Sequence, residues 1–265
     1  MFWGKSFIWD SVPSETYNLG IVNFDTGKIN SPAGSDIEMF TKSVYRKPKV
    51  YLYGVSQRPV LQFSLTIGSP DYVDANMRSL IEKYLFGHTS YKKLQILETD
   101  LQDVYFNCLI TKGVSSYIGN MNIGFECDVI CDSPWAYEFP KTLYFDYPEN
   151  VVTDTNYTFF NMSANNDYTY PTIEFKINNV GVGNPVRITN YSDNDRIYGF
   201  TGLAKGELIT TDCERQIFTT SRDIYRLNTF NKNWLRFVPG ANLLNIYGGL
   251  SYLEIVTQNV RKVGG

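Results

Sequence analysis

The chain has 265 residues, of which 24 are basic and 27 acidic, so its formal charge is only −3. This near-neutral balance excludes the strongly basic surface that binding to phosphate backbones requires, and we expect no specific nucleic-acid partner. The opening ten residues are too short, and too interrupted by Lys5 and Asp10, to form a signal-peptide core. No later run approaches the ~20 apolar residues of a membrane span, so we expect no membrane partner and a protein kept in a reducing cytosol before assembly.

The first half predicts strands around a single helix. Residues 6–25 read as two short strands around a turn, and residues 47–68 alternate between aromatic or apolar and polar side chains. That alternation is typical of strands, because successive side chains point to opposite faces. Residues 91–114 and 120–138 return to the same pattern, which favours a mainly β first domain.

The one helix is expected within residues 69–88. Ser69 or Asp71 is the predicted N-cap, and Gly87 supplies the stop. Helical spacing puts six apolar residues on one stripe that we expect to face the core: Val73, Met77, Leu80, Ile81, Tyr84 and Leu85.

A change in amino-acid composition marks the expected domain boundary. Residues 139–170 are rich in Asn, Asp, Thr and Pro, which indicates turns, and we place the boundary near Tyr147. Domains therefore span residues 1–147 and 148–265. The second contains short strands at regular intervals with no helical crossover, the pattern of a β-sandwich or jelly roll.

Residues 230–249 predict a hairpin near the end of the chain. Pro239 and Gly240 suit the central positions of a type II turn between two apolar runs. Trp234, Arg236 and Val238 would share one face, and Leu235 and Phe237 the other. Because both faces are largely apolar, we expect Trp234 to be a core or inter-sheet residue and not a platform for a sugar ring.

Four cysteines raise the questions of disulfides and metal binding. Cys127 and Cys131 are four residues apart on an expected strand, a separation of roughly 13 Å, so they cannot bridge each other. His88 is the only imidazole that could join them on zinc. We therefore expect Cys108, Cys127, Cys131 and Cys213 to be free thiols, with no metal and no cofactor.

No catalytic constellation emerges from the remaining motifs. His88 directly follows the helix stop, where an imidazolium favours the negative end of the helix dipole. The acidic groups Glu98, Asp100 and Asp103, and Asp212 beside Glu214, could in principle supply the two carboxylates of a glycosidase, but such clusters are usually solvated turns. Three N-x-Ser/Thr triplets begin at Asn156, Asn161 and Asn190, which we interpret as ordinary polar positions.

Three stretches in order resemble the distal tail protein (Dit) family of tailed bacteriophages. They are FIWDSVPSETYNLGIVNFD at residues 7–25, RKPKVYLYGVSQRPVLQFSLTIG at 46–68, and the late run from GELITTDCERQIFTT to LNTFNKNWLRFVPGANLLNIYG at 206–248. The resemblance implies an N-terminal β-sandwich with one α-helix that forms a hexameric ring, and a galectin-like C-terminal jelly roll. It implies no enzyme and no catalytic residues.

The resemblance also implies partners and a location. Such rings lie at the virion tail tip, after synthesis in the host bacterial cytoplasm, and join the tail tube protein to the tail-associated hub or lysin protein. In some relatives they also hold receptor-binding proteins. The alternative function is a carbohydrate-binding module for host cell-surface glycans, with a glycoside hydrolase as a more distant reading.

Overall fold

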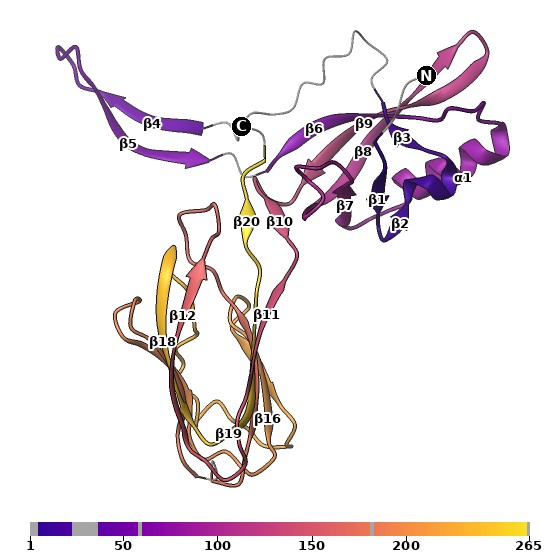
Figure 1. Cartoon of the computed structure of the whole chain (residues 1–265). Helices are drawn as coiled ribbons and strands as arrows, with labels where there is room; N and C mark the ends of the chain where they lie inside the picture. Colours follow the sequence, from indigo (N-terminus) through magenta and orange to yellow (C-terminus); the bar gives the residue numbers. More distant parts are fainter. Residues whose placement is uncertain (1–4, 23–36, 58–59, 181–182, 264–265) are drawn as a thin grey trace. The chain divides into compact units, whose positions relative to one another are not determined.

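The computed structural model describes residues 5–22, 37–57, 60–180 and 183–263 (Figure 1). The chain divides into two compact units, the first made of Met1–Glu138 and Arg261–Gly265 and the second of Phe139–Val260. The described residues form twenty strands, one α-helix and one short 3-10 helix, η1 (Ser14–Tyr17). The predicted fold class, mainly β with a single α-helix in the first half, is confirmed. No helix in the described parts of the chain has the length and apolar character needed to cross a bilayer.

One antiparallel sheet forms the body of the first unit, in the order β2-β1-β7-β8-β9-β6-β3. Short β10 (Ala136–Glu138) adds to β8, and β20 (Val260–Arg261) pairs with β10. The other strands are β1 (Phe7–Trp9), β2 (Val12–Pro13), β3 (Gly20–Ile21), β6 (Gln62–Gly68), β7 (Lys92–Ile96), β8 (Val104–Ile118) and β9 (Met121–Cys131).

The helix α1 (Ala75–Phe86) begins later than the predicted caps. Its N-cap is Asp74, whose carboxylate accepts a hydrogen bond from the Met77 N–H at 2.7 Å. Ser69 and Asp71 were therefore wrong as caps. The Ser69 hydroxyl accepts instead from the Asp71 N–H at 3.3 Å, in the turn before the helix.

Only part of the predicted apolar stripe is buried. Ile81, Tyr84 and Leu85 lie in the core, and Val73 just ahead of the helix joins them. Met77 and Leu80 are 40% and 52% exposed, so the prediction was wrong for these two. The pattern predicts a continuous apolar stripe, but among the described residues the apolar contacts of the helix with the core come from its second half.

The second half of α1 is fixed to the sheet by specific contacts. The buried Trp9 indole donates to the Tyr84 carbonyl at 3.0 Å, and the Tyr84 hydroxyl donates to the Val12 carbonyl at 2.9 Å. Gly113 in β8 lets the helix approach, because a Cβ atom there would lie 2.1 Å from the Phe86 ring. The helix ends at Gly87, where glycine is required because a Cβ atom would lie 2.4 Å from the Lys83 carbonyl oxygen.

The second unit is a sandwich of two antiparallel sheets, ordered β11-β19-β13-β16-β17 and β12-β18-β14-β15 (Figure 1). Its hydrophobic core is rich in aromatic side chains, with Phe175, Phe200 and Phe237 among the fully buried ones. The strands are β11 (Lys141–Asp146), β12 (Thr153–Asn161), β13 (Thr172–Ile177), β14 (Val186–Asn190), β15 (Arg196–Phe200), β16 (Leu208–Asp212), β17 (Ile217–Thr220), β18 (Gly240–Gly248) and β19 (Leu250–Thr257).

Two of these strands lie where the sequence indicated turns. β11 pairs with β19 from Lys141 to Asp146, so these residues belong to the second unit, although the sequence boundary near Tyr147 assigns them to the first domain. β12 pairs with β18 along all nine of its residues. Its inward positions include Thr153 and Asn161, and these polar residues conceal the alternation that β12 does have.

Candidate interaction surface

A two-stranded hairpin, residues 37–57, stands out in the first unit. Its strands β4 (Ile37–Ser43) and β5 (Val50–Gln57) pair antiparallel with each other and with no other described strand (Figure 1). The register runs from Ile37 opposite Gln57 to Ser43 opposite Val50, with an irregularity after Phe40. A two-stranded hairpin alone is marginally stable in water, so this one requires a covering surface to be well ordered.

The hairpin exposes the side chains that would normally be buried. Every residue from Met39 to Tyr53 is exposed. Soluble monomers rarely leave so many large apolar groups together at the surface, and such patches mark interaction sites. The large exposed members are Met39, Phe40, Val44, Tyr45, Val50, Tyr51, Leu52 and Tyr53.

The hairpin is also cationic. Between Met39 and Gly54 the sequence contains Lys42, Arg46, Lys47 and Lys49 but no acidic residue. The Arg46 guanidinium lies 5.3 Å from the Tyr45 ring centre, and the Lys49 ammonium 5.9 Å from that of Tyr51. Aromatic residues, Met and Arg are enriched at protein interfaces, and the hairpin contains Met39, Phe40, Arg46 and three tyrosines.

The sequence predicted the strand β5 but not the exposure of its side chains. Residues 47–68 were expected to alternate into one β-domain, whereas the structure divides them between β5, in the hairpin, and β6, in the main sheet. Leu65 and Ile67 of β6 are buried, while Leu52 of β5 is exposed. Alternation predicts which side chains need cover, but it does not say which surface covers them.

His88 lies at the end of α1, as its position in the sequence suggested. Its Nε2 atom is 3.0 Å from the Tyr84 carbonyl oxygen, and its ring meets Trp9 edge-on with ring centres 5.5 Å apart. Its Nδ1 atom lies 3.8 Å from the Asp10 carboxylate. These contacts anchor the helix end against β1, which is a structural use of the imidazole.

The first acidic group is engaged in ion pairs. Glu98 pairs with Lys5, and Asp103 accepts from the Arg261 guanidinium at 2.8 Å. Asp100 contributes its main-chain carbonyl to the same arginine, at 3.0 Å. The arginine and lysine therefore tie together neighbouring segments of the first unit.

The second acidic group lies in a turn. β16 ends at Asp212, whose carboxylate accepts from the N–H groups of Glu214 and Arg215 at 3.1 and 3.0 Å. Asp212 and Glu214 do not share a strand face, because the chain turns directly after Asp212. Asp212 stabilises that turn.

The predicted hairpin at residues 230–249 is absent from the described structure. β18 forms as expected, but it pairs with β12 and β14 and not with the residues before Pro239. Gly240 has φ +86, as the third position of the predicted type II turn requires. Before the turn, Phe237 makes a single bridge to Thr169.

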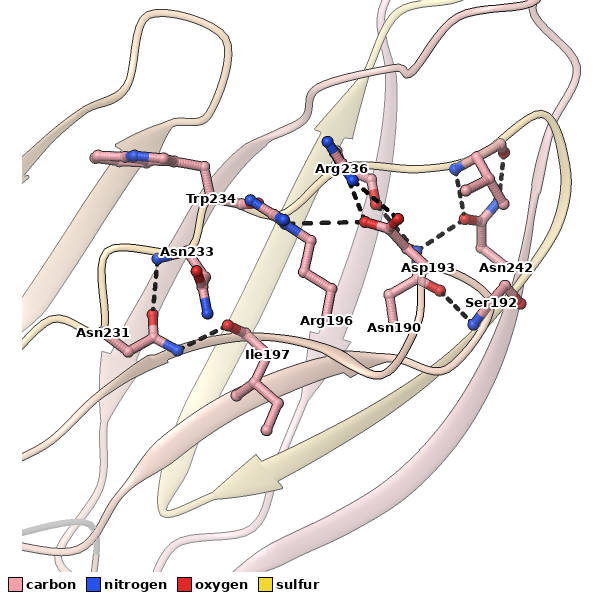
Figure 2. Close-up of polar contacts among 11 residues, drawn as sticks. Asn190, Ser192, Asp193, Arg196, Ile197, Asn231, Asn233, Trp234, Arg236 and Asn242 are labelled. Carbon is pink, nitrogen blue, oxygen red and sulfur yellow. Dashed lines mark hydrogen bonds and ion pairs between the residues drawn. The ribbon is translucent and has the colours of Figure 1, made fainter.

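Asparagine side chains hold that preceding segment in place of a strand. The Asn161 amide donates to the Val238 carbonyl at 3.2 Å, and the Asn190 amide to the Arg236 carbonyl at 3.0 Å. Asn242 donates to the Val238 carbonyl at 2.8 Å and accepts from the Val238 N–H at 2.9 Å (Figure 2). Side-chain amides thus complete backbone hydrogen bonds that the sequence pattern assigned to strand pairing.

An ion pair reinforces the same segment. Arg236 donates from Nε and Nη2 to the Asp193 carboxylate at 2.7 and 3.1 Å, and Asp193 is buried (Figure 2). The Tyr168 ring lies over the Arg236 guanidinium, 3.7 Å from it. Arg196 donates to the Trp234 carbonyl at 2.7 Å. These contacts are mutually satisfied within the chain, so the cluster serves the fold.

Trp234 packs at the margin of the core. Leu235 and Phe237 are fully buried as expected, whereas Trp234 is half-buried and packs against the core from its edge. Its ring lies 4.8 Å from that of Phe230 and 6.2 Å from that of Phe218. Those aromatic contacts make it a partial core residue.

All four cysteines are free and buried. Cys108, Cys127 and Cys131 belong to the core of the first unit, and Cys213 to that of the second. Among the described residues, no group of three or more His, Cys, Asp or Glu side chains is placed to hold a metal ion.

Comparison with known proteins identifies the family. Residues 2–133 match the model of a phage tail protein N-terminal domain, and residues 135–256 that of a phage tail C-terminal domain. No curated protein sequence matches the chain.

Two solved structures share the fold. The Dit protein (gp 19.1) of phage SPP1, described as a paradigm of the hub adsorption apparatus in phages that infect Gram-positive bacteria, superposes with a TM-score of 0.68 and 11% identity, over 97% of this chain and 99% of that one. A chain of the phage P2 baseplate in its activated, Ca-containing conformation has a TM-score of 0.57 and 8% identity, over 98% and 99% of the two chains. The resemblance to distal tail proteins is therefore confirmed, and the chain belongs to the phage tail protein family.

Proposed function

We propose that this protein is a structural component of the virion tail tip, where six copies form a ring through their first units. The ring joins the tail tube protein to the tail-associated hub or lysin protein and has no enzymatic role. Its copies are made in the host cytoplasm and assemble there. The galectin-like second unit is the part available for further partners, including a receptor-binding protein.

The observation that carries this proposal is the exposed 37–57 hairpin. A lone chain gains little by exposing Phe40, Leu52 and Tyr53 to water, whereas burying them against another subunit is favourable by about 25 cal/mol per Å² of apolar surface. The exposed Met77 and Leu80 of α1 offer a second apolar area in the same unit. An assembly that covers such surfaces stabilises both the hairpin and the subunit contact.

Membership of the phage tail family and the shared fold with SPP1 Dit support the tail-tip location. The near-neutral charge of −3 fits a protein that contacts other proteins and not nucleic acid. The carbohydrate-binding alternative is not favoured, because Trp234 packs on Phe230 and Phe218 and the family match indicates a tail component.

Mass photometry of the full chain, alone and with the tail-associated hub protein, tests the ring. We expect a species of six chain masses, and its loss in the double variant Leu52→Ser/Tyr53→Ser. The matched control is Tyr225→Ser in the second unit, because Tyr225 and Tyr53 are both 69% exposed. A wild-type chain that remains monomeric at high concentration in both settings, or a ring unaffected by the hairpin variant, contradicts the proposal.

A further inference from the structure

Two of the four cysteines lie directly opposite each other on neighbouring strands. Cys108 of β8 and Cys131, the last residue of β9, are register partners in the antiparallel pair. The N–H of Asp132 donates to the carbonyl of Asn107 at 2.9 Å, and this bond flanks the cysteine pair. In an antiparallel ladder, that pattern identifies Cys108 and Cys131 as a non-hydrogen-bonded pair, the closer of the two kinds.

The geometry of such a position suits a disulfide. Opposed residues there have Cα atoms about 4.5 Å apart, within the roughly 4.4 to 6.8 Å range of disulfides. Both side chains point to the same face of the sheet, and neither is more than 1% exposed. A hydrogen bond with Cys131, together with burial, raises the pKa of Cys108 well above its ordinary value. The two thiols therefore already interact.

We propose that Cys108 and Cys131 form an intramolecular disulfide when the protein meets a peroxide, which joins β8 and β9 covalently at this end of the sheet. One thiolate attacks a peroxide oxygen, the O–O bond breaks, and a sulfenic acid and water form once a proton is taken up. The second thiol attacks that sulfur, the S–S bond forms, and a second water leaves. Two thiols are oxidised and one peroxide molecule is reduced to two waters.

The reaction is slow in the folded chain and depends on local opening. Burial and the raised pKa of Cys108 keep the pair in its thiol form, whereas the thiolate is the reactive species. Cys131 is at the end of β9, and strand ends open at lower free energy than strand centres. Peroxide is small enough to enter through such an opening.

The setting for this chemistry rests on the proposed function. A tail component is made in a reducing cytosol and then leaves the cell, and disulfides persist in oxidising surroundings. A bond between Cys108 and Cys131 closes the loop that contains the long β8–β9 hairpin, so it restrains the unfolded state. The sheet that supports α1 would then be strengthened after release of the particle.

The test uses the full chain, purified with reductant, transferred to reductant-free buffer and incubated with hydrogen peroxide. We expect titratable thiols, counted after denaturation, to fall from four to two, and peptide mapping to find Cys108 linked to Cys131. Cys108→Ser and Cys131→Ser should abolish the link. Cys127→Ser is the matched control, because Cys127 lies buried on the same strand and face but opposite Gly113, and it should retain the link.

Three results overturn the inference: four thiols that persist in peroxide, oxidation to sulfinic or sulfonic acids without a bond, or a link that involves Cys127 or Cys213. The wild-type peptide map decides the question even if a serine variant fails to fold. Mass photometry of the same samples separates the two proposals. A chain with this disulfide and no ring contradicts only the proposed function, and a ring without the disulfide contradicts only this inference.

Discussion

The buried ion pair between Glu207 and Arg226 allows a quantitative test of the second unit. Glu207 is fully buried and Arg226 is 7% exposed, and the two make a two-pronged contact at 2.8 and 2.6 Å. The Ala204 N–H and the Thr220 hydroxyl donate to the same carboxylate at 2.8 and 2.7 Å. Arg226 also donates to the Gly202 carbonyl at 2.9 Å, so the pair connects the 202–207 loop, the end of β17 and the segment around Arg226.

The perturbation is Arg226→Met, which keeps much of the side-chain volume but leaves the Glu207 carboxylate buried without its cation. Removing one partner of a buried pair costs about 3 to 5 kcal/mol. Since 1 kcal/mol lowers the melting temperature by at least about 2 °C in domains of up to 250 residues, we expect a fall of at least about 6 °C in the transition of the second unit. Calorimetry of the full chain measures it.

Two further variants make this prediction sharp. Arg222→Met is the matched control, because the Arg222 side chain is exposed and donates to the Lys205 carbonyl, and the change should alter stability by less than about 0.5 kcal/mol. Glu207→Gln combined with Arg226→Met should recover part of the loss, since no buried charge remains. If Arg226→Met melts within about 2 °C of wild type, the assignment of this pair as a main support of the loops is refuted.

The same pair predicts the response to acid. Burial by itself would raise the pKa of Glu207, but hydrogen bonds from Arg226, the Ala204 N–H and Thr220 outweigh it, so the pKa lies below its ordinary value of 4.5. A carboxylate with a lowered pKa in the folded state stabilises the fold above its unfolded pKa and loses that contribution as the pH falls. The wild type should therefore lose stability below about pH 4.5 more steeply than Arg226→Met, as equilibrium denaturation at stepped pH would reveal. Parallel pH profiles for the two proteins would contradict this.

Three other predictions test packing. Gly113→Val should detach α1 from β8 and lower the melting temperature of the first unit, since a Cβ atom there meets the Phe86 ring at 2.1 Å; an unchanged transition contradicts the docking. Asn161→Ala should cost about 1 to 3 kcal/mol in denaturant unfolding, because it removes the donor to the Val238 carbonyl, whereas the exposed Asn156→Ala should cost little. Leu235→Ala, at about 2 to 5 kcal/mol, should destabilise more than Trp234→Ala, and the reverse order would show Trp234 to be the more deeply packed residue.

The sequence predicts those strands whose inward residues are apolar, because alternation of apolar and polar residues is the pattern that it shows. Alternation found β8, β9 and β19, since their inward residues are apolar, as in Phe125, Cys127 and Val129. It missed β12, whose inward positions include Thr153 and Asn161, because hydropathy does not register a buried amide that bonds to backbone carbonyls. The strand predicted before Pro239 is absent, because asparagine side chains make the hydrogen bonds of the main chain there and no neighbouring strand is needed.

The 37–57 hairpin marks the limit of reading burial from sequence. Residues 50–53 of the hairpin, Val-Tyr-Leu-Tyr, are as apolar as the inward residues of β6, yet β6 is covered by its own chain and these four residues are exposed. An apolar strand sequence indicates side chains whose burial is favourable, and it contains no information on whether the cover comes from the same chain. Where such apolar side chains are exposed, as at Phe40, Leu52 and Tyr53, we propose that another molecule covers them. The difference between sequence expectation and single-chain structure is thus itself the observation that points to assembly.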